Sequence, residues 1–299
     1  IAHTNAKKAV IGISGGLDST LALLVSAECM RQLGRPSDDV IGITMPCFGT
    51  SDRTFNNSLE LMKTLGVESK TISIKNACLQ HFDDIGHDPN VLDVTYENSQ
   101  ARERTQILMD YAGMVGGFVV GTGDLSELAL GWCTYNGDHM SMYAVNCDVP
   151  KTLIRWIIDS LVESGKFASS ADVLRDILDT PISPELLPPD AKGKISQVTE
   201  DIVGPYALHD FFLFYTVRYG FEPEKIYHLA KRAFKNDFSN EVIKKWLKTF
   251  YKRFFTQQFK RNCVPDGVKV GSVALSPRGD WKMPSDASAN LWLDAVDKL

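Results

Sequence analysis

The chain has 299 residues, of which 44% are hydrophobic and 23% charged, and its formal net charge is −5. This composition excludes a disordered, collagen-like or low-complexity chain, and the length provides ample material for a core. No window reaches the ~18 consecutive apolar residues that a membrane helix needs. The slight excess of acid argues against a dedicated binder of nucleic acid or anionic membranes.

Six cysteines lie scattered along the chain, with no CxxC pair and no Cys/His spacing typical of zinc. Such cysteines are usually small buried hydrophobic residues in a reducing compartment. No signal or transit peptide opens the chain, so the sequence predicts a cytoplasmic protein. The chain begins with Ile1 rather than Met, and we expect it to be cut from something longer.

Short apolar runs alternate with helical periodicity through the first half of the chain. Strands are predicted over 8–13, 38–45, 69–74 and 116–121, with helices over 19–33, 54–66 and 97–115 between them. Because parallel strands need helical crossovers, the pattern predicts an α/β fold with a doubly wound parallel sheet. We predict a single domain over 1–299. Its α/β core covers about 1–150, and a helical half with a loop-rich tail covers 151–299.

The pattern changes after residue 150. A helix is predicted over 150–164, about four more follow, and the tail 262–299 is rich in Gly, Pro and Asp. The stretch 180–197 is too rich in proline for a regular helix, and we predict a loop that closes over bound nucleotide. The basic, aromatic stretch 244–261 is read as an amphipathic helix, because its aromatic residues recur every four positions.

The strongest local signal is GISGGLDST, residues 12–20, between a predicted strand and a predicted helix. Adjacent glycines allow the backbone to approach an anion closely, and a helix N-terminus directs free N–H groups at it. Ser14 and Ser19 add hydroxyl donors, and Asp18 can hold a cation that bridges phosphates. The GK[ST] ending of a Walker A loop is missing. A plain glycine-rich turn is the alternative, but the complete string favours a phosphate site.

This string resembles the signature of the ATP pyrophosphatases, the PP-loop family, whose fold is adenine nucleotide alpha hydrolase-like. Five stretches resemble NAD synthetases in the same order: 97–106, 121–155, 180–188, 204–221 and 259–281. The resemblance is greatest to the synthetase portion of the long, glutamine-dependent enzymes. A lysine of the short, ammonia-using enzymes aligns with Tyr135, so the contact there should follow the long-form pattern.

The resemblance implies ATP-dependent amidation of deamido-NAD to NAD through an adenylated nicotinate, with release of AMP and pyrophosphate. Ammonia would come from glutamine through a nitrilase-like glutaminase domain, which we do not find in this chain. No Glu/Lys/Cys amidase set is identifiable, so we expect the chain to use free ammonium. The family also implies Mg²⁺ as cofactor and a homodimer or higher homo-oligomer.

Roles carry over from the family residue by residue. The implied ATP-binding residues are Gly12, Ile13, Ser14, Gly15, Gly16, Leu17, Asp18, Ser19, Thr122, Lys151 and Ser183. The implied deamido-NAD-binding residues are Asn98, Arg102, Glu127, Trp132, Cys133, Thr134, Tyr135 and Lys260. Asp18 and Glu127 would hold Mg²⁺, and with Lys151 they form the implied catalytic set.

Most of these residues also have an ordinary structural explanation. Asn98 and Arg102 suit a solvated helix face, and Glu127 near Asp124 suits an acid at a helix N-terminus. His139 has no partnered nucleophile, which favours a structural or dimer-contact histidine.

Two other functions remain open at this point. One is another PP-loop enzyme, such as a GMP synthetase or a tRNA-modifying ligase, and the net charge argues against a tRNA substrate. The other is a nucleotide-binding sensor without catalysis, which should lack the paired acids.

Overall fold

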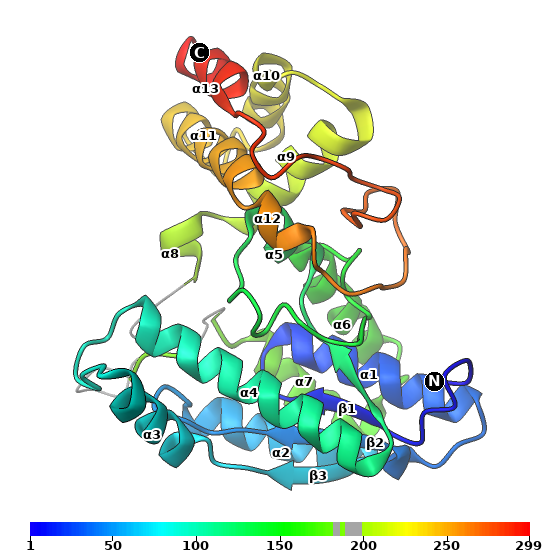
Figure 1. Cartoon of the computed structure of the whole chain (residues 1–299). Coiled ribbons are helices and arrows are strands. Elements are labelled where there is room, and N and C mark those ends of the chain that lie inside the picture. Colours follow the sequence, from blue (N-terminus) through cyan, green and yellow to red (C-terminus); the bar gives the residue numbers. More distant parts are fainter. Residues whose placement is uncertain (182–185, 189–198) are drawn as a thin grey trace.

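The computed structural model describes residues 1–181, 186–188 and 199–299. In these ranges one parallel sheet has the strand order β3-β2-β1-β4-β5 (Figure 1). The strands are β1 Ala9–Gly12, β2 Val40–Thr44, β3 Glu68–Thr71, β4 Phe118–Gly121 and β5 Tyr143–Ala144. The strand order reverses at β1, and open α/β sheets bind ligands beyond the carboxyl ends of the strands at such a point. The doubly wound α/β prediction is confirmed.

Five helices lie in the first half, and those over 17–32, 52–65 and 94–115 lie close to their predicted ranges. They are α1 Leu17–Gln32, α2 Asp52–Leu65, α3 Lys75–Ile85, α4 Val94–Val115 and α5 Leu125–Leu130, with a 3-10 turn at Ser37–Asp39. The periodicity analysis missed α3, α5 and β5; α5 has six residues and β5 two, so neither is long enough to show a clear period. Ser51 begins α2 as its N-cap and accepts a hydrogen bond from Thr54 N, and the left-handed Gly66 ends the helix as predicted.

Helices cover both faces of the sheet. On one face pack α1, α2, α6 (Lys151–Glu163) and α7 (Ala171–Leu178), the last preceded by a 3-10 turn at Ala168–Ser170. On the other face pack α3 and α4. Ala9 and Ile11 of β1 belong to the first core and Val10 to the second, because successive side chains of a strand point to opposite faces.

A second, helical body lies at one end of the sheet (Figure 1). It contains α8 Thr199–Val203, α9 Tyr206–Tyr219, α10 Pro223–Ala233, α11 Asn240–Thr256, α12 Gln258–Arg261 and α13 Asn290–Asp297. The predicted amphipathic helix is confirmed with Trp246, Phe250 and Phe254 buried, although it stops at Thr256 and α12 follows as a separate short helix. The loop-rich tail was predicted without α13, whose eight residues pack on α11 and α10.

The two halves of the sequence interleave in space. Although α5 precedes residue 150, its Leu125, Ala129 and Leu130 join the helical core, whereas α6 and α7 follow residue 150 and cover the sheet. The division into an α/β core over about 1–150 and a helical half over 151–299 stays a prediction. The predicted lid falls largely on 182–185 and 189–198, and these residues, Ser183 included, lie outside the described residues. Among the helices described, none is long and apolar enough to cross a membrane.

His209 on α9 should make stability depend on pH. The imidazole is 1% exposed, and its Nε2 lies 2.7 Å from the carbonyl oxygen of Val203. Burial lowers the pKa of His209 from 6.5 to about 4. Between pH 6.5 and pH 4 this histidine is therefore protonated in the unfolded chain but neutral in the folded chain. The free energy of unfolding falls as the pH drops through this interval, by about 3 kcal/mol in total.

Urea unfolding of the wild type and of His209→Phe, at a series of pH values from 7 to 4, gives the free energy of unfolding of each protein. The difference between the two pH profiles measures the contribution of His209. The variant should lose less stability over that interval, because it has no group to protonate. Parallel pH profiles for the two proteins would contradict the assignment.

Candidate active site

A cleft of about 670 Å³ opens beyond the carboxyl ends of β1 and β4 and extends to the helical body. The sheet contributes Gly12 and Gly121 to its lining, and α11 contributes Arg253. All the predicted site residues line this cleft except two: Gly15, which packs against α2, and Ser183, which is not among the described residues. Residues from distant parts of the chain are thus brought together, as the implied site requires.

The glycine loop forms one wall of the cleft. Ser14 Oγ accepts a hydrogen bond from Gly16 N at 3.2 Å and lies 3.1 Å from Ser19 Oγ, so the loop is ordered by its own hydroxyls. Gly16 is the N-cap of α1 and offers no side chain to cap it. The first-turn N–H groups of α1 are therefore oriented for an anion in the cleft.

Four charged groups converge beside that loop. The ammonium of Lys151 lies 2.5 Å from Asp18 Oδ2, 2.8 Å from Asp124 Oδ2 and 3.1 Å from Glu127 Oε1. The Lys151 side chain is 3% exposed and that of Asp124 is fully buried. Burial alone would lower the pKa of Lys151, but the three carboxylates outweigh it and raise the pKa well above the ordinary value. Lys151 is therefore a fixed cation among three acids.

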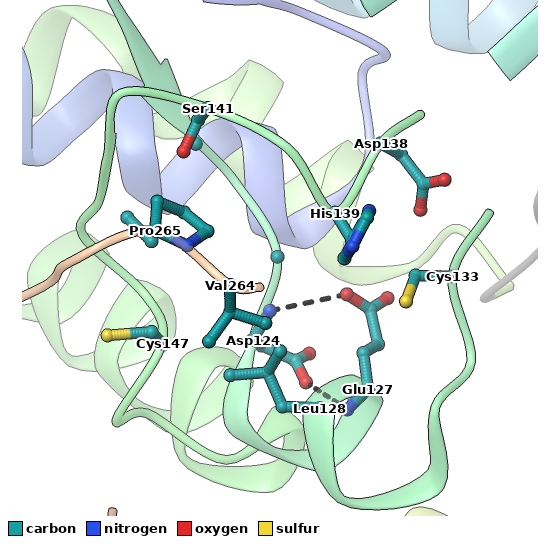
Figure 2. A pocket seen from close by; sticks show the side chains of 13 residues that line it. Asp124, Glu127, Leu128, Cys133, Asp138, His139, Ser141, Cys147, Val264 and Pro265 are labelled. Atoms are coloured by element: carbon teal, nitrogen blue, oxygen red, sulfur yellow. Dashed lines mark hydrogen bonds between the residues drawn. The ribbon is translucent and has the colours of Figure 1, made fainter. Parts of the chain in front are cut away.

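Asp124 is a member of the cluster that the sequence analysis did not select as a site residue. It is the N-cap of α5 and accepts a hydrogen bond from Glu127 N at 2.8 Å, while Glu127 Oε2 accepts one from Asp124 N at 3.2 Å (Figure 2). Glu127 is thus both a capping residue and a member of the charged cluster. The D-x-x-E spacing of a capping box, shortly after a strand, is the sequence signal that could have selected Asp124 together with Glu127.

The cluster suits a divalent cation. One carboxylate oxygen from each of Asp18, Asp124 and Glu127 lies within 4.8 Å of the others. Asp18 Oδ1 is buried and accepts no hydrogen bond from any described residue. Burial raises the pKa of Asp124 well above its ordinary value and that of Glu127 to about 7. A divalent cation would favour the ionised carboxylates, and Mg²⁺ prefers carboxylate oxygen. The donor set fits the metal that the family implies.

Behind Glu127 lies a small cavity of about 20 Å³, large enough for one water-sized molecule. Figure 2 shows Glu127, Asp138 and His139 around it. His139 is 7% exposed, its Nδ1 accepts a hydrogen bond from Asn136 N, and its Nε2 lies 3.4 Å from Cys263 Sγ. These contacts hold His139 in a structural position.

The opposite wall of the cleft is the segment from Trp132 to Tyr135, which α4 holds in place. Thr134 Oγ1 donates to Asn98 Oδ1 at 2.7 Å, and Arg102 Nε donates to the carbonyl of Tyr135 at 3.2 Å. Asn98 and Arg102 are therefore more than a solvated helix face: both line the cleft and both order the segment predicted to lie along the nicotinate.

Three cations from α11 and α12 bind the carbonyl groups at the C-terminal end of α5. Arg253 Nε donates to Leu130, Lys260 Nζ donates to Gly131 and Cys133, and Arg261 Nη1 donates to Leu128 and Ala129, all at 2.7–3.0 Å. Cations at a helix C-terminus are favoured by the helix dipole. Lys260, predicted to contact dinucleotide, thus also fixes the backbone beside Trp132.

Asp210 on α9 holds the helix that carries Lys151. Pro150 is the N-cap of α6 and cannot cap it, but Asp210 Oδ2 accepts from Thr152 N at 3.1 Å and from Thr152 Oγ1 at 2.7 Å. Asp210 Oδ1 accepts from Ser126 Oγ, which accepts from Lys151 N at 2.9 Å. The sequence analysis missed Asp210, because nothing local links it to α6.

We expect Asp210→Ala to lower the free energy of unfolding by about 2–4 kcal/mol, since it leaves the buried hydroxyl of Ser126 on α5 and the first-turn N–H of Thr152 on α6 without this acceptor. Denaturant unfolding measures the change. Asp159→Asn, an exposed acid on α6 itself, is the control and should change stability by less than about 0.5 kcal/mol. Equal effects of the two variants would show that Asp210 has no special role.

Comparison with known proteins identifies the family of the chain. Residues 1–256 match the sequence family described as NAD synthase. The chain is 46% identical over 315 aligned residues to the glutamine-dependent NAD(+) synthetase of Mycobacterium leprae, covering 97% of the chain and 46% of that protein. It is 31% identical over 283 residues to the enzyme of the same name from Thermotoga maritima, covering 93% of the chain and 44% of that protein. The chain thus spans about half the length of these curated relatives.

A solved structure shares the fold. The glutamine-dependent NAD(+) synthetase from Cytophaga hutchinsonii superposes with a TM-score of 0.79 at 17% identity, covering 99% of this chain and 53% of that one. At this identity the likeness shows the fold alone. Since the family match extends over most of the sequence, the chain belongs to the NAD synthase family.

Proposed function

We propose that the chain catalyses ATP-dependent amidation of deamido-NAD to NAD, with release of AMP and pyrophosphate. One observation carries the proposal: the glycine loop, the Lys151 cluster and the Trp132–Tyr135 segment face a single cleft. Activation of a carboxylate by ATP requires a phosphate site and a carboxylate site side by side, with charge stabilisation between them.

In this proposal ATP lies against residues 12–19, with Thr122, Lys151 and Ser183 as further contacts. The N–H groups of the loop and of the first turn of α1 donate to phosphate oxygens. Lys151 supplies a positive charge where charge builds on the leaving pyrophosphate. Asp18 and Glu127 would hold Mg²⁺, with Asp124 beside them, and the metal would neutralise phosphate charge when bound.

Deamido-NAD occupies the other side of the cleft. Asn98, Arg102, Glu127 and Lys260 are its proposed polar contacts, and the Trp132–Tyr135 segment lies along its nicotinate end. The nicotinate carboxylate attacks the α-phosphate of ATP and displaces pyrophosphate. Ammonia then attacks the adenylated carbonyl and displaces AMP, so the protein contributes mainly position and electrostatic stabilisation.

Nitrogen supply and assembly are also proposals. The curated relatives are named glutamine-dependent, which supports glutamine as the source of ammonia through a glutaminase domain in the full-length protein. The family resemblance supports a homodimer or higher homo-oligomer in the cytoplasm.

The test is a reaction of the 299-residue chain with ATP, Mg²⁺, ammonium and deamido-NAD, followed by chromatography of the nucleotides. We expect NAD and AMP in equal amounts, and neither product when deamido-NAD is omitted. Binding of nucleotide without AMP release would instead favour the sensor, and AMP release with xanthosine monophosphate in place of deamido-NAD would favour a GMP synthetase.

A further inference from the structure

Arg253 is a cation without an acidic partner in the cleft wall. Its side chain is partly buried, its Nε donates to the carbonyl of Leu130 at 2.8 Å, and its guanidinium carbon lies 5.4 Å from the ring centroid of Trp132. In the described part of the chain, no other hydrogen bond and no carboxylate contact is made by this guanidinium. A desolvated charge usually has a charged or polar partner, and this one faces the cleft.

The neighbouring cations differ from Arg253 in this respect. Arg261 is 1% exposed. Its guanidinium donates hydrogen bonds to Gln258 Oε1 and to the carbonyl groups of Leu128, Ala129 and Phe254. Lys260 Nζ donates to two carbonyl groups. Arg253 makes one bond through Nε, which orients the guanidinium, and leaves its two terminal nitrogens for a ligand. A guanidinium presented in this way suits the two oxygens of a carboxylate.

Tyr206 provides a second unpaired group in the same cleft. Its side chain is 2% exposed, and its hydroxyl has no hydrogen-bond partner among the described residues. Its ring centroid lies 5.4 Å from Lys151 Nζ, so the residue adjoins the charged cluster. Buried tyrosine hydroxyls normally have a partner, and here the cleft is where one can bind.

We propose that Arg253 and Tyr206 form the subsite for the pyridine carboxylate of deamido-NAD, and that Arg253 makes the site select this acid over the corresponding amide. The proposal rests on the proposed function and deepens it. The Arg253 guanidinium lies over the indole of Trp132, and both side chains line the cleft, so a pyridine ring bound along Trp132 would bring its carboxylate near Arg253. Phosphate has its own donors at the glycine loop. Amidation removes the negative charge, so the product loses the charge-assisted bonds to Arg253 and leaves more readily.

The test compares dissociation constants for deamido-NAD and NAD, measured by calorimetry on the 299-residue chain without turnover. The two dinucleotides differ only in carboxylate against carboxamide. We expect the wild type to prefer deamido-NAD and Arg253→Gln to lower that preference about 10- to 100-fold, mainly by weakening deamido-NAD binding. Arg253→Lys should retain an intermediate preference, and Tyr206→Phe should also weaken deamido-NAD more than NAD.

Two controls separate this subsite from general effects. Lys252→Gln makes the same change of charge one residue away on the exposed side of α11 and should leave the preference unchanged. ATP affinity should stay within threefold in Arg253→Gln, and thermal unfolding checks that both variants are folded. Two results for folded Arg253→Gln would overturn the subsite but not the proposed function. One is an unchanged preference for deamido-NAD over NAD, and the other is a loss of ATP affinity with no change in that preference. Failure of the wild type to bind either dinucleotide overturns both the subsite and the proposed function.

Discussion

Asp18→Asn is expected to lower the rate of AMP formation from ATP and deamido-NAD by at least about 100-fold, equivalent to roughly 3 kcal/mol of transition-state stabilisation. The substitution keeps the size of the side chain but removes a carboxylate from the cluster around Lys151, and with it one proposed ligand of Mg²⁺. The Mg²⁺ concentration for half-maximal rate should rise as well.

The same variant should remain folded. The Asp18 side chain is 24% exposed, and Lys151 keeps Asp124 and Glu127 as partners, so the free energy of unfolding should change by less than about 1 kcal/mol. Asp110→Asn, an exposed acid on α4, makes the same change of charge and should leave the rate unaltered. Full activity of Asp18→Asn at ordinary Mg²⁺ would remove Asp18 from the metal site.

Gly15→Ala is expected to disrupt the glycine loop and to lower the free energy of unfolding by about 2–5 kcal/mol. Gly15 has φ +85°, a region that side chains other than glycine rarely adopt. A Cβ atom there would lie 2.2 Å from the carbonyl oxygen of Thr54 and 2.9 Å from its carbonyl carbon. Because these are backbone atoms of α2, the loop must move, and ATP affinity should fall with stability.

Gly16→Ala is the matched control for Gly15→Ala. Gly16 has φ −92°, and a Cβ atom at that position would have Ser14 Oγ at 3.4 Å as its nearest neighbour. Denaturant unfolding should therefore show a change of less than about 1 kcal/mol for this variant. If the two alanine variants are equally stable, the close approach of Gly15 to α2 does not constrain the loop.

The sequence by itself determined the parallel α/β fold and the position of the phosphate loop. Both depend on local information: apolar runs separated by helical periodicity, and SGGLDS between a strand and a helix. The family resemblance added the residues from Asn98 to Lys260 because each lay in a recognisable string. The elements missed in the first half were α5 and β5, which are short, and α3, although its buried Cys78 and Phe82 lie at helical spacing.

Only the tertiary structure decided which charges meet. Lys151 reaches Asp18 across 133 residues of sequence, and Asp210 reaches Thr152 from another helix. Arg253 lies in the stretch predicted as an amphipathic helix, and Tyr206 lies in one of the stretches that resemble NAD synthetases. Only the packing of α9 and α11 around α5 directs both side chains into the cleft. Hydrophobic periodicity determines which face of a helix is buried, but the position of a polar group on that face relative to another helix depends on how the helices pack.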